Sequence, residues 1–313
     1  MGNALVDMMI QIDHDDWLEK FELPKGSMQL VDAQKSATIR EACSNMNIRQ
    51  IAGGSASNTI FGLASLGAHT GFIGKTGDDA IGQFYRSDIE SANIHPMLFT
   101  GNAPTGVAAA LVSPDSERTF GTYLGSAIEL SASDLTPMLF EGYTYFHIEG
   151  YLVQNHDLMR KAITLARQAG CLISIDLASY NVVADNLHFL NEIMADKLHI
   201  IFANEEESKA FTGLEPEEAL DVIAQKADIA VVKIGSRGAL VKRADERVHV
   251  PAHTVQPIDT TGAGDLFAAG FIYGIGSGAS LQEAAELGTS LATAVISVIG
   301  ARPEASFWDN LKG

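Results

Sequence analysis

A strand, a helix and a second strand follow one another in residues 143–176, YTYFHIEGYLVQNHDLMRKAITLARQAGCLISID. Tyr143–Ile148 and Leu172–Asp176 are rich in β-branched and aromatic residues, whereas Asp157–Gln168 between them repeats its apolar residues at helical spacing. The alternation continues downstream in two more expected strands and a helix, His199–Ala203, Ile229–Ile234 and Pro216–Lys226. Strands that alternate with helices pair in parallel and are covered by helices on both faces. The sequence therefore predicts an α/β fold with a doubly wound, mostly parallel sheet.

The first third of the chain is less regular. Two expected strands and two expected helices alternate in it, Ile51–Gly54, Ser55–Leu66, Thr70–Ile73 and Asp79–Ala92. Two stretches, residues 8–50 and 95–125, interrupt this pattern, and the second holds two strand-like segments around a turn, Thr105–Val112 and Glu117–Tyr123. We expect one domain, residues 1–313, in which these inserted stretches form a small β-sheet that closes over the ligand as a lid.

Composition limits the classes of partner. The 313 residues include 39 Asp and Glu against 21 Lys and Arg, which gives a formal net charge of −18. A chain this acidic repels phosphate backbones and anionic lipid, so we expect no nucleic acid and no membrane among its partners. Cys43 and Cys171 stand far apart without the spacing of a metal site, and the N-terminus lacks the pattern of a signal peptide. We expect a cytoplasmic protein that binds a small molecule.

The segment DTTGAGD, Asp259–Asp265, carries the strongest sign of chemistry. Apolar residues follow it at helical spacing, so a helix is expected to begin within GAGD and to end near Gly276. The glycine-rich first turn would present free backbone N–H groups that, with the helix dipole, bind a phosphoryl group. Asp265 would be repelled by that anion, but its position is useful if it accepts the proton of an attacking hydroxyl. The alternative is that Asp265 only complements the helix dipole.

A second cluster, Gly53-Gly54-Ser55-Ala56-Ser57-Asn58, lies between an expected strand and an expected helix. A glycine pair there lets the backbone approach a ligand closely, and Asn58 offers both a donor and an acceptor. The alternative is a glycine turn followed by a capping serine. Near the start of the chain, Asp7 ends a short apolar run, which would place a carboxylate at the C-terminal end of a strand, where ligands of open α/β sheets bind.

Two other patterns predict no function. Gly74-Lys75-Thr76 ends like a P-loop, but His69 stands where that motif requires glycine, and no helix-forming run follows. His147 lies within an apolar strand and is expected to be a core residue rather than a ligand.

Together, these motifs resemble the ribokinase-like (PfkB) family of carbohydrate and nucleoside kinases. The resemblance covers essentially the whole chain and rests on five motifs in the family's order: GNALVD at 2–7, GGSASN at 53–58, GKTGDDAIG at 74–82, NEEE at 204–207 and DTTGAGD at 259–265. Within the family, GNALVD, residues 104–119 and HIEGYL at 147–152 are more similar to the adenosine kinase branch. The resemblance implies a ribokinase-like α/β domain with a β-sheet lid, which transfers the γ-phosphate of ATP to a hydroxymethyl group and uses Mg²⁺.

The same resemblance implies roles for individual residues. Asp265 matches the family's catalytic base, and the anion hole is matched by Gly262, Ala263 and Gly264. Positions that hold the hydroxyls of the substrate are matched by Asn3, Asp7, Gly53, Gly54 and Asn58. Contacts to ATP are matched by Asn204, Glu207, Gly235, Ser236, Gly238 and the lid residue Arg118, with Glu207 also expected to hold Mg²⁺ through water. Asp259 and Thr261 match positions that often hold a monovalent cation such as K⁺.

The chain departs from the family pattern in two places. It begins at Met1-Gly2, whereas the family has several strand residues before this glycine, so we expect a truncated first strand or a misassigned start codon. Glu304 stands near the point where some members complete the cation site with a small polar residue, which weakens the inference of a K⁺ site. The expected oligomeric state is a monomer or a homodimer formed through the lid.

Three functions stay open at this stage. A kinase of a sugar or nucleoside is favoured because the base and the anion hole are both present. A non-catalytic sensor of such molecules would need no base beside a phosphate site. A kinase of an already phosphorylated sugar would need extra cations near Asp7 and Gly54, where the sequence offers only Arg49. A nucleoside would need an apolar wall for its base, for which the candidates are Leu5, Phe120 and Tyr123.

Overall fold

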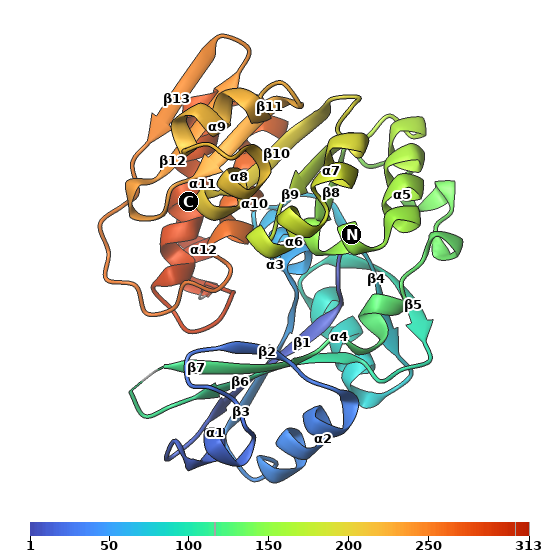
Figure 1. The fold of residues 1–313 in the computed structure, drawn as a ribbon, viewed down its shortest axis with the longest axis vertical. Coiled ribbons are helices and arrows are strands. Elements are labelled where there is room, and N and C mark those ends of the chain that lie inside the picture. The colour runs from blue at the N-terminus through green and yellow to red at the C-terminus, as the bar shows by residue number, and fades with distance from the viewer. Residues whose placement is uncertain (116, 304, 313) are drawn as a thin grey trace.

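The computed structural model describes residues 1–115, 117–303 and 305–312, and Figure 1 shows a larger and a smaller part, each built on its own sheet. The sheet of the larger part has the strand order β13-β12-β11-β10-β9-β8. Its strands are β8 (Tyr145–Glu149), β9 (Leu172–Asp176), β10 (Leu198–Asn204), β11 (Ala227–Lys233), β12 (Ala239–Arg243) and β13 (Glu246–Val250). Strands β8 to β11 pair in parallel, and β12 and β13 extend the sheet antiparallel. The predicted mostly parallel sheet is therefore confirmed.

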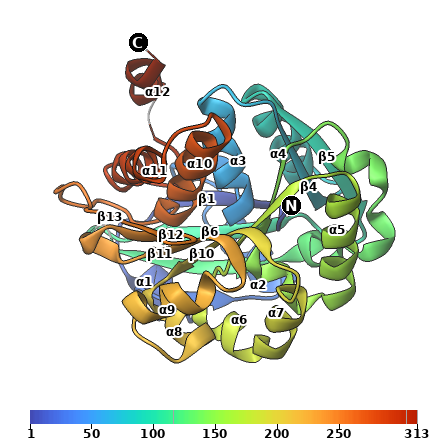
Figure 2. The same ribbon diagram turned by 90° about the horizontal axis from the view of Figure 1, so that it is seen from above.

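Helices cover both faces of this sheet, as the view from above shows (Figure 2). One layer contains α3 (Ser55–Ser65), α10 (Ala263–Gly276) and α11 (Leu281–Ile296), and the other contains α6 (Tyr180–Asp185), α7 (Leu187–Ile193), α8 (Glu205–Thr212) and α9 (Pro216–Ile223). Side chains of β10 alternate between the layers: Phe202 packs against Phe271 of α10, whereas Ile201 lies in the cluster that holds Leu190 and Leu220. Burial of both faces explains why the parallel strands are almost continuously apolar.

The smaller part is a five-stranded sheet in the order β2-β7-β6-β1-β3, which we call the small sheet. Its strands are β1 (Leu5–Gln11), β2 (Met28–Leu30), β3 (Ile48–Gly53), β6 (Gly106–Val112) and β7 (Arg118–Tyr123). The expected antiparallel strands of residues 105–123 are present as β6 and β7. Helices α1 (Asp16–Lys20) and α2 (Ala33–Ala42) supply Leu18 and Ile39 to a core that also holds Val6 and Ile10 of β1.

The remaining elements lie outside these two sheets. Strands β4 (Thr70–Gly77) and β5 (Ile94–Gly101) form a separate parallel pair, joined through α4 (Ala80–Ser91). The other helices are α5 (His156–Gln168), α12 (Ala305–Lys312) and the 3₁₀ helices η1 (Gly125–Glu129), η2 (Ala132–Asp134), η3 (Pro137–Phe140), η4 (Gly150–Gln154) and η5 (Gly235–Arg237). No helix within the described ranges is long and apolar enough to cross a membrane. The small sheet is not built only from the expected stretches 8–50 and 95–125, since β1 begins at Leu5 and β5 pairs with β4 outside this sheet. The action of the small sheet as a lid stays a prediction.

One expectation about β1 is wrong. Asp7 is the third residue of this strand and does not end it, because the chain continues in register to Gln11 beside β6. The buried residues Val6, Met8 and Ile10 extend the alternation past Asp7, and that core keeps the strand going. Asp7 consequently reaches the site from the middle of β1, and its side chain lies on the face of the sheet opposite to that of Val6, Met8 and Ile10.

Candidate active site

The N-terminus of α10 is the centre of the candidate site. The helix begins at Ala263 and ends at Gly276, as the sequence predicted, and Gly262 precedes it with a φ of 77°. A Cβ atom on Gly262 would lie 2.8 Å from Cβ of Ala301, so a side chain does not fit there. The first turn of a helix has N–H groups without intrahelical partners, and that of Ala263 donates to the Thr260 carbonyl at 3.2 Å. This glycine-rich turn has the geometry of an anion cradle.

Asp265 lies in this first turn and is held by the second sequence cluster, more than two hundred residues away. Its Oδ1 accepts a hydrogen bond from Ser55 Oγ at 2.6 Å, and its Oδ2 accepts one from Asn58 Nδ2 at 2.9 Å. Burial raises the pKa of Asp265 to about 6, although the hydrogen bonds from Ser55 and Asn58 lower it. Helix α3 can approach α10 closely because Gly62 faces Ala269, where a Cβ would lie 2.6 Å from the alanine methyl. The two motifs therefore form one site.

Glu149 is a site residue that the sequence analysis missed. Its Oε1 accepts hydrogen bonds from the backbone N–H of Asn3 at 2.8 Å and from Asn3 Nδ2 at 2.6 Å, and its Oε2 accepts one from Ala56 N at 3.0 Å. Burial raises the pKa of Glu149 to about 7. Glu149 thus joins the N-terminal segment to the start of α3, and a carboxylate at the C-terminal end of the apolar strand β8 was the signal for it. The amide of Asn3 binds Glu149, and Gly54, at φ 94°, fits against the Asn3 carbonyl, where a Cβ would lie at 2.2 Å.

The face of the small sheet that carries Asp7 is turned away from α1 and α2, and we call it the open face. Directly paired residues point to the same side of a sheet. The registers therefore place on it Leu5, Asp7, Met9, Met28, Leu30, Arg49, Ile51, Ala108, Ala110, Arg118, Phe120 and Thr122. Gly53 makes room for the Asp7 carboxylate, since a Cβ there would lie 2.3 Å from Cγ of Asp7. Burial, aided by Asp265 and Asp259 and opposed by Arg302, raises the pKa of Asp7 to about 7. The prediction that Tyr123 contributes to an apolar wall at the site is wrong. Tyr123 pairs with Val107 and therefore lies on the face of the sheet that packs against α1 and α2.

In the sheet of the larger part, three adjacent parallel strands each end in a polar residue. They are Asp176 of β9, Asn204 of β10 and Lys233 of β11. Asn204 and Glu207 form a capping box at the start of α8, with Glu207 Oε2 accepting from Asn204 N at 2.8 Å and Oε1 from Nδ2 at 2.6 Å. Burial, followed by the charge of Asp176, raises the pKa of Glu207 to about 7 against the opposing effect of Lys233.

The expected nucleotide loop, Gly235, Ser236 and Gly238, follows β11 as the helix η5 and the turn after it. Gly235 and Gly238 both have positive φ, at 56° and 101°, and a Cβ on Gly238 would lie 1.9 Å from the Val250 carbonyl oxygen. Ser236 is exposed, and Arg237 beside it forms an ion pair with Glu205. These residues form an open loop on the same side of the sheet as Asn204 and Lys233.

Asp259 does not fit a monovalent cation in this arrangement. Its carboxylate accepts hydrogen bonds from Thr261 N at 2.9 Å and Gly300 N at 2.6 Å, and it forms an ion pair with Arg118. The Arg118 guanidinium already supplies a positive charge there, and a second cation would be repelled by it. Arg118 also joins the small sheet to the segment before α10. Glu304, which bore on the same inference, lies outside the described residues.

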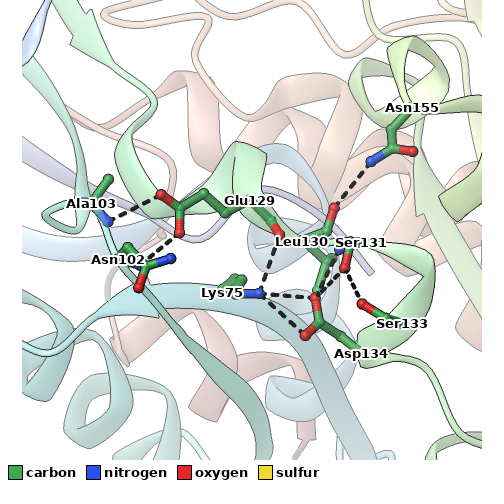
Figure 3. A network of polar contacts seen from close by, with 9 residues as sticks. All are labelled: Lys75, Asn102, Ala103, Glu129, Leu130, Ser131, Ser133, Asp134 and Asn155. Carbon is green, nitrogen blue, oxygen red and sulfur yellow. Dashed lines mark hydrogen bonds and ion pairs between the residues drawn. The ribbon is translucent and has the colours of Figure 1, made fainter.

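The two patterns set aside in the sequence are structural. Lys75 of β4 donates to Asp134 Oδ1 at 3.2 Å and Oδ2 at 3.0 Å, and to the Glu129 carbonyl at 3.2 Å (Figure 3). Its ammonium is therefore fully engaged by protein oxygens, so Gly74-Lys75-Thr76 is no phosphate loop. His147 is buried and shares a hydrogen bond of 2.9 Å between its Nδ1 and Ser174 Oγ, and burial lowers its pKa to about 3. Both predictions are confirmed.

The comparisons with known proteins agree with this geometry. The chain is 35% identical to a structure described as adenosine kinase from Sinorhizobium meliloti, with a TM-score of 0.87, covering 99% of this chain and 97% of that one. It is 33% identical to a probable sugar kinase from Rhizobium etli CFN 42, with a TM-score of 0.86, covering 99% of this chain and 96% of that one. An ATP-dependent ribose-1-phosphate kinase from Halopiger xanaduensis is 30% identical over 248 residues, 78% of each protein.

The family description "pfkB family carbohydrate kinase" matches residues 27–307, which include the Asp259–Asp265 motif, the Asn204–Glu207 run and the expected nucleotide loop. The ribokinase-like fold and the resemblance read from the motifs are thereby confirmed. The chain belongs to the PfkB family of carbohydrate kinases, which are ATP-dependent phosphotransferases.

Proposed function

We propose that this kinase transfers the γ-phosphate of ATP to a hydroxymethyl group of a nucleoside or a related sugar, with Asp265 as the general base. The observation that supports this most is the position of the Asp265 carboxylate, which lies in the first turn of α10 and is fixed by Ser55 and Asn58. The acceptor hydroxyl gives its proton to Asp265 as its oxygen attacks the γ-phosphorus. The bond to the β-phosphate oxygen then breaks, and ADP leaves.

The raised pKa of Asp265 suits this role. At about 6, it leaves the carboxylate ionised at neutral pH and still basic enough to take a proton. The N–H groups at the start of α10, those of Gly262, Ala263 and Gly264, would bind the charge that develops on the phosphoryl oxygens, and the N–H of Ala263 would exchange the Thr260 carbonyl for the phosphoryl group. Arg118 would direct one of its free guanidinium N–H groups to a phosphate when ATP binds, while it keeps its ion pair with Asp259.

Mg²⁺, when bound, would neutralise charge between the phosphates. Each Glu207 oxygen has one bond to Asn204, and a carboxylate can accept about four, so Glu207 fits a water-mediated contact to the ion. No group of three His, Cys, Asp or Glu side chains suited to a metal occurs in the described part of the chain. A single carboxylate such as Glu207 suits a Mg²⁺ ion that is held mainly by phosphates and water. Asn204 would orient Glu207 through the capping box.

On the substrate side, the open face favours a nucleoside. Asp7 would accept hydrogen bonds from sugar hydroxyls, and Gly54 and Asn58 lie beside it in the same site. Met28 and Leu30 are large apolar side chains with 65% and 71% of their surface exposed, and they share the open face with Phe120. An exposed apolar wall next to hydroxyl acceptors suits a flat base joined to a sugar.

We also infer a cytoplasmic enzyme that acts as a monomer or as a dimer through the small sheet.

A substrate panel tests this proposal. ADP release is measured with adenosine, inosine, ribose, fructose, 2-keto-3-deoxygluconate and ribose 1-phosphate for the wild type and Asp265→Asn. We expect phosphorylation of a nucleoside, and loss of kcat by at least about 10²-fold in the variant with ligand binding retained. Phe120→Ala should raise KM for the nucleoside, whereas Tyr123→Ala, on the other face, should not. Full turnover by Asp265→Asn would refute the base, and a preference for ribose 1-phosphate would assign the Arg49 side of the open face to a phosphate.

A further inference from the structure

Lys233 is a partly buried cation to which the proposed reaction has so far given no role. It ends β11 beside Asn204, and its Nζ lies 2.6 Å from Asp176 Oδ2, with 16% of the lysine side chain and 6% of the aspartate side chain exposed. Burial by itself lowers the pKa of Lys233, but Asp176, Glu207 and Asp265 raise it above its usual value. The ammonium is therefore charged at neutral pH.

The ammonium lies against the anion cradle. A Cβ atom on Gly264 would lie 2.9 Å from Lys233 Nζ, so this glycine gives the lysine access to the first turn of α10. Both the ammonium and a helix N-terminus are electropositive, and the helix dipole disfavours a cation there. Their close approach is favourable when an anion lies between them. The glycine and the lysine thus border the same phosphoryl position.

Lys75 is a partly buried lysine whose contacts are all structural. Its side chain is 12% exposed, similar to that of Lys233, but it has contacts to both oxygens of Asp134 and to a main-chain carbonyl (Figure 3). For Lys233, the one hydrogen-bond partner among the described residues is Asp176. A lysine ammonium has three donors, so two are available to a ligand.

We propose that Lys233 is a catalytic residue whose ammonium binds a non-bridging oxygen of the transferring phosphoryl group, and that Asp176 is the residue that positions it. The proposal rests on phosphoryl transfer at this site. Lys233 remains protonated throughout: the hydroxyl proton goes to Asp265, the acceptor oxygen bonds to phosphorus, and ADP departs with the electrons of the broken bond. The lysine contributes charge stabilisation that grows as the phosphoryl group moves between donor and acceptor.

The test compares Lys233→Met with the matched control Lys75→Met. The control removes a lysine of similar exposure from its ion pair with Asp134, outside the site. Loss of a preorganised donor to a developing charge typically lowers kcat by about 10²–10³-fold, and we expect this for Lys233→Met, with KM for the acceptor changed little. A second readout is thermal stabilisation by ADP with aluminium fluoride and acceptor, a mimic of the phosphoryl group in transfer. Lys233→Met should lose the gain over ADP alone, whereas Lys75→Met should keep both that gain and kcat.

Other outcomes separate the two proposals. If the wild type phosphorylates none of the acceptors, the proposed function fails. If the wild type is active and Asp265→Asn is inactive, but Lys233→Met retains kcat and the fluoride complex, the inference about Lys233 is refuted alone. Should Lys233→Met not fold, Asp176→Asn keeps the lysine and loosens its position; it should lower kcat without raising KM, and unchanged kcat in Asp176→Asn would overturn the proposal.

Discussion

Replacing Ser55 by alanine should move the pH dependence of the enzyme in a predictable direction. Ser55 Oγ donates to Asp265 Oδ1 at 2.6 Å, and a hydrogen bond to a charged group stabilises it by about 1.5–3 kcal/mol. The bond favours the ionised carboxylate, so its loss raises the pKa of Asp265. At 1.36 kcal/mol per unit, the acid limb of kcat/KM should shift upward by roughly one to two pH units from its wild-type position near the Asp265 pKa of about 6.

The assay is the rate of phosphoryl transfer at low acceptor concentration across the pH range in which the protein is folded. Because the base must be deprotonated, Ser55→Ala should be slower than the wild type in mild acid and should recover at alkaline pH. Thr59→Val is the matched control: its hydroxyl donates to the backbone carbonyl of Asp265 at 3.1 Å and does not contact the carboxylate. The reasoning is refuted if Ser55→Ala retains the wild-type midpoint, or if Thr59→Val shifts it as far.

Three further outcomes are expected. Asp7→Ala should weaken acceptor binding strongly and ATP binding little, measured by titration with a thermal melt beside it; equal loss of both ligands would indicate misfolding instead. Replacing K⁺ by choline at equal ionic strength should leave kcat unchanged, because Arg118 occupies Asp259, and strict K⁺ dependence would contradict this. The ligand-free protein should melt at a higher temperature near pH 5.5 than near pH 7.5, because four carboxyls, those of Asp7, Glu149, Glu207 and Asp265, have raised pKa values and so bind protons more tightly in the folded state. The lowered pKa values of His147 and the Met1 amine oppose this trend, but these groups are fewer. A melting temperature that does not rise toward pH 5.5 would contradict the raised pKa values.

Local patterns predicted the elements of the larger part well. The expected strand Leu172–Asp176 is β9 without change, and the helix expected from GAGD to Gly276 is α10. The reason is physical: strands buried on both faces must be apolar throughout, and helices must begin and end at residues that satisfy their free N–H and C=O groups. The errors fell in the small sheet, where the end of β1 and the face of Tyr123 depend on which strands pair and in which register.

The sequence by itself predicted the α/β class, the family, the candidate base Asp265 and the cluster that contains Asn58, because strand and helix patterns and short motifs are local in the chain. The tertiary structure decided which partners those residues have. Ser55 beside Asp265, Glu149 beneath Asn3, Lys233 against Gly264 and Arg118 on Asp259 are contacts between segments far apart in the chain. A pKa or a charge pairing depends on burial and on neighbours within a few ångströms, and only folding brings those neighbours together.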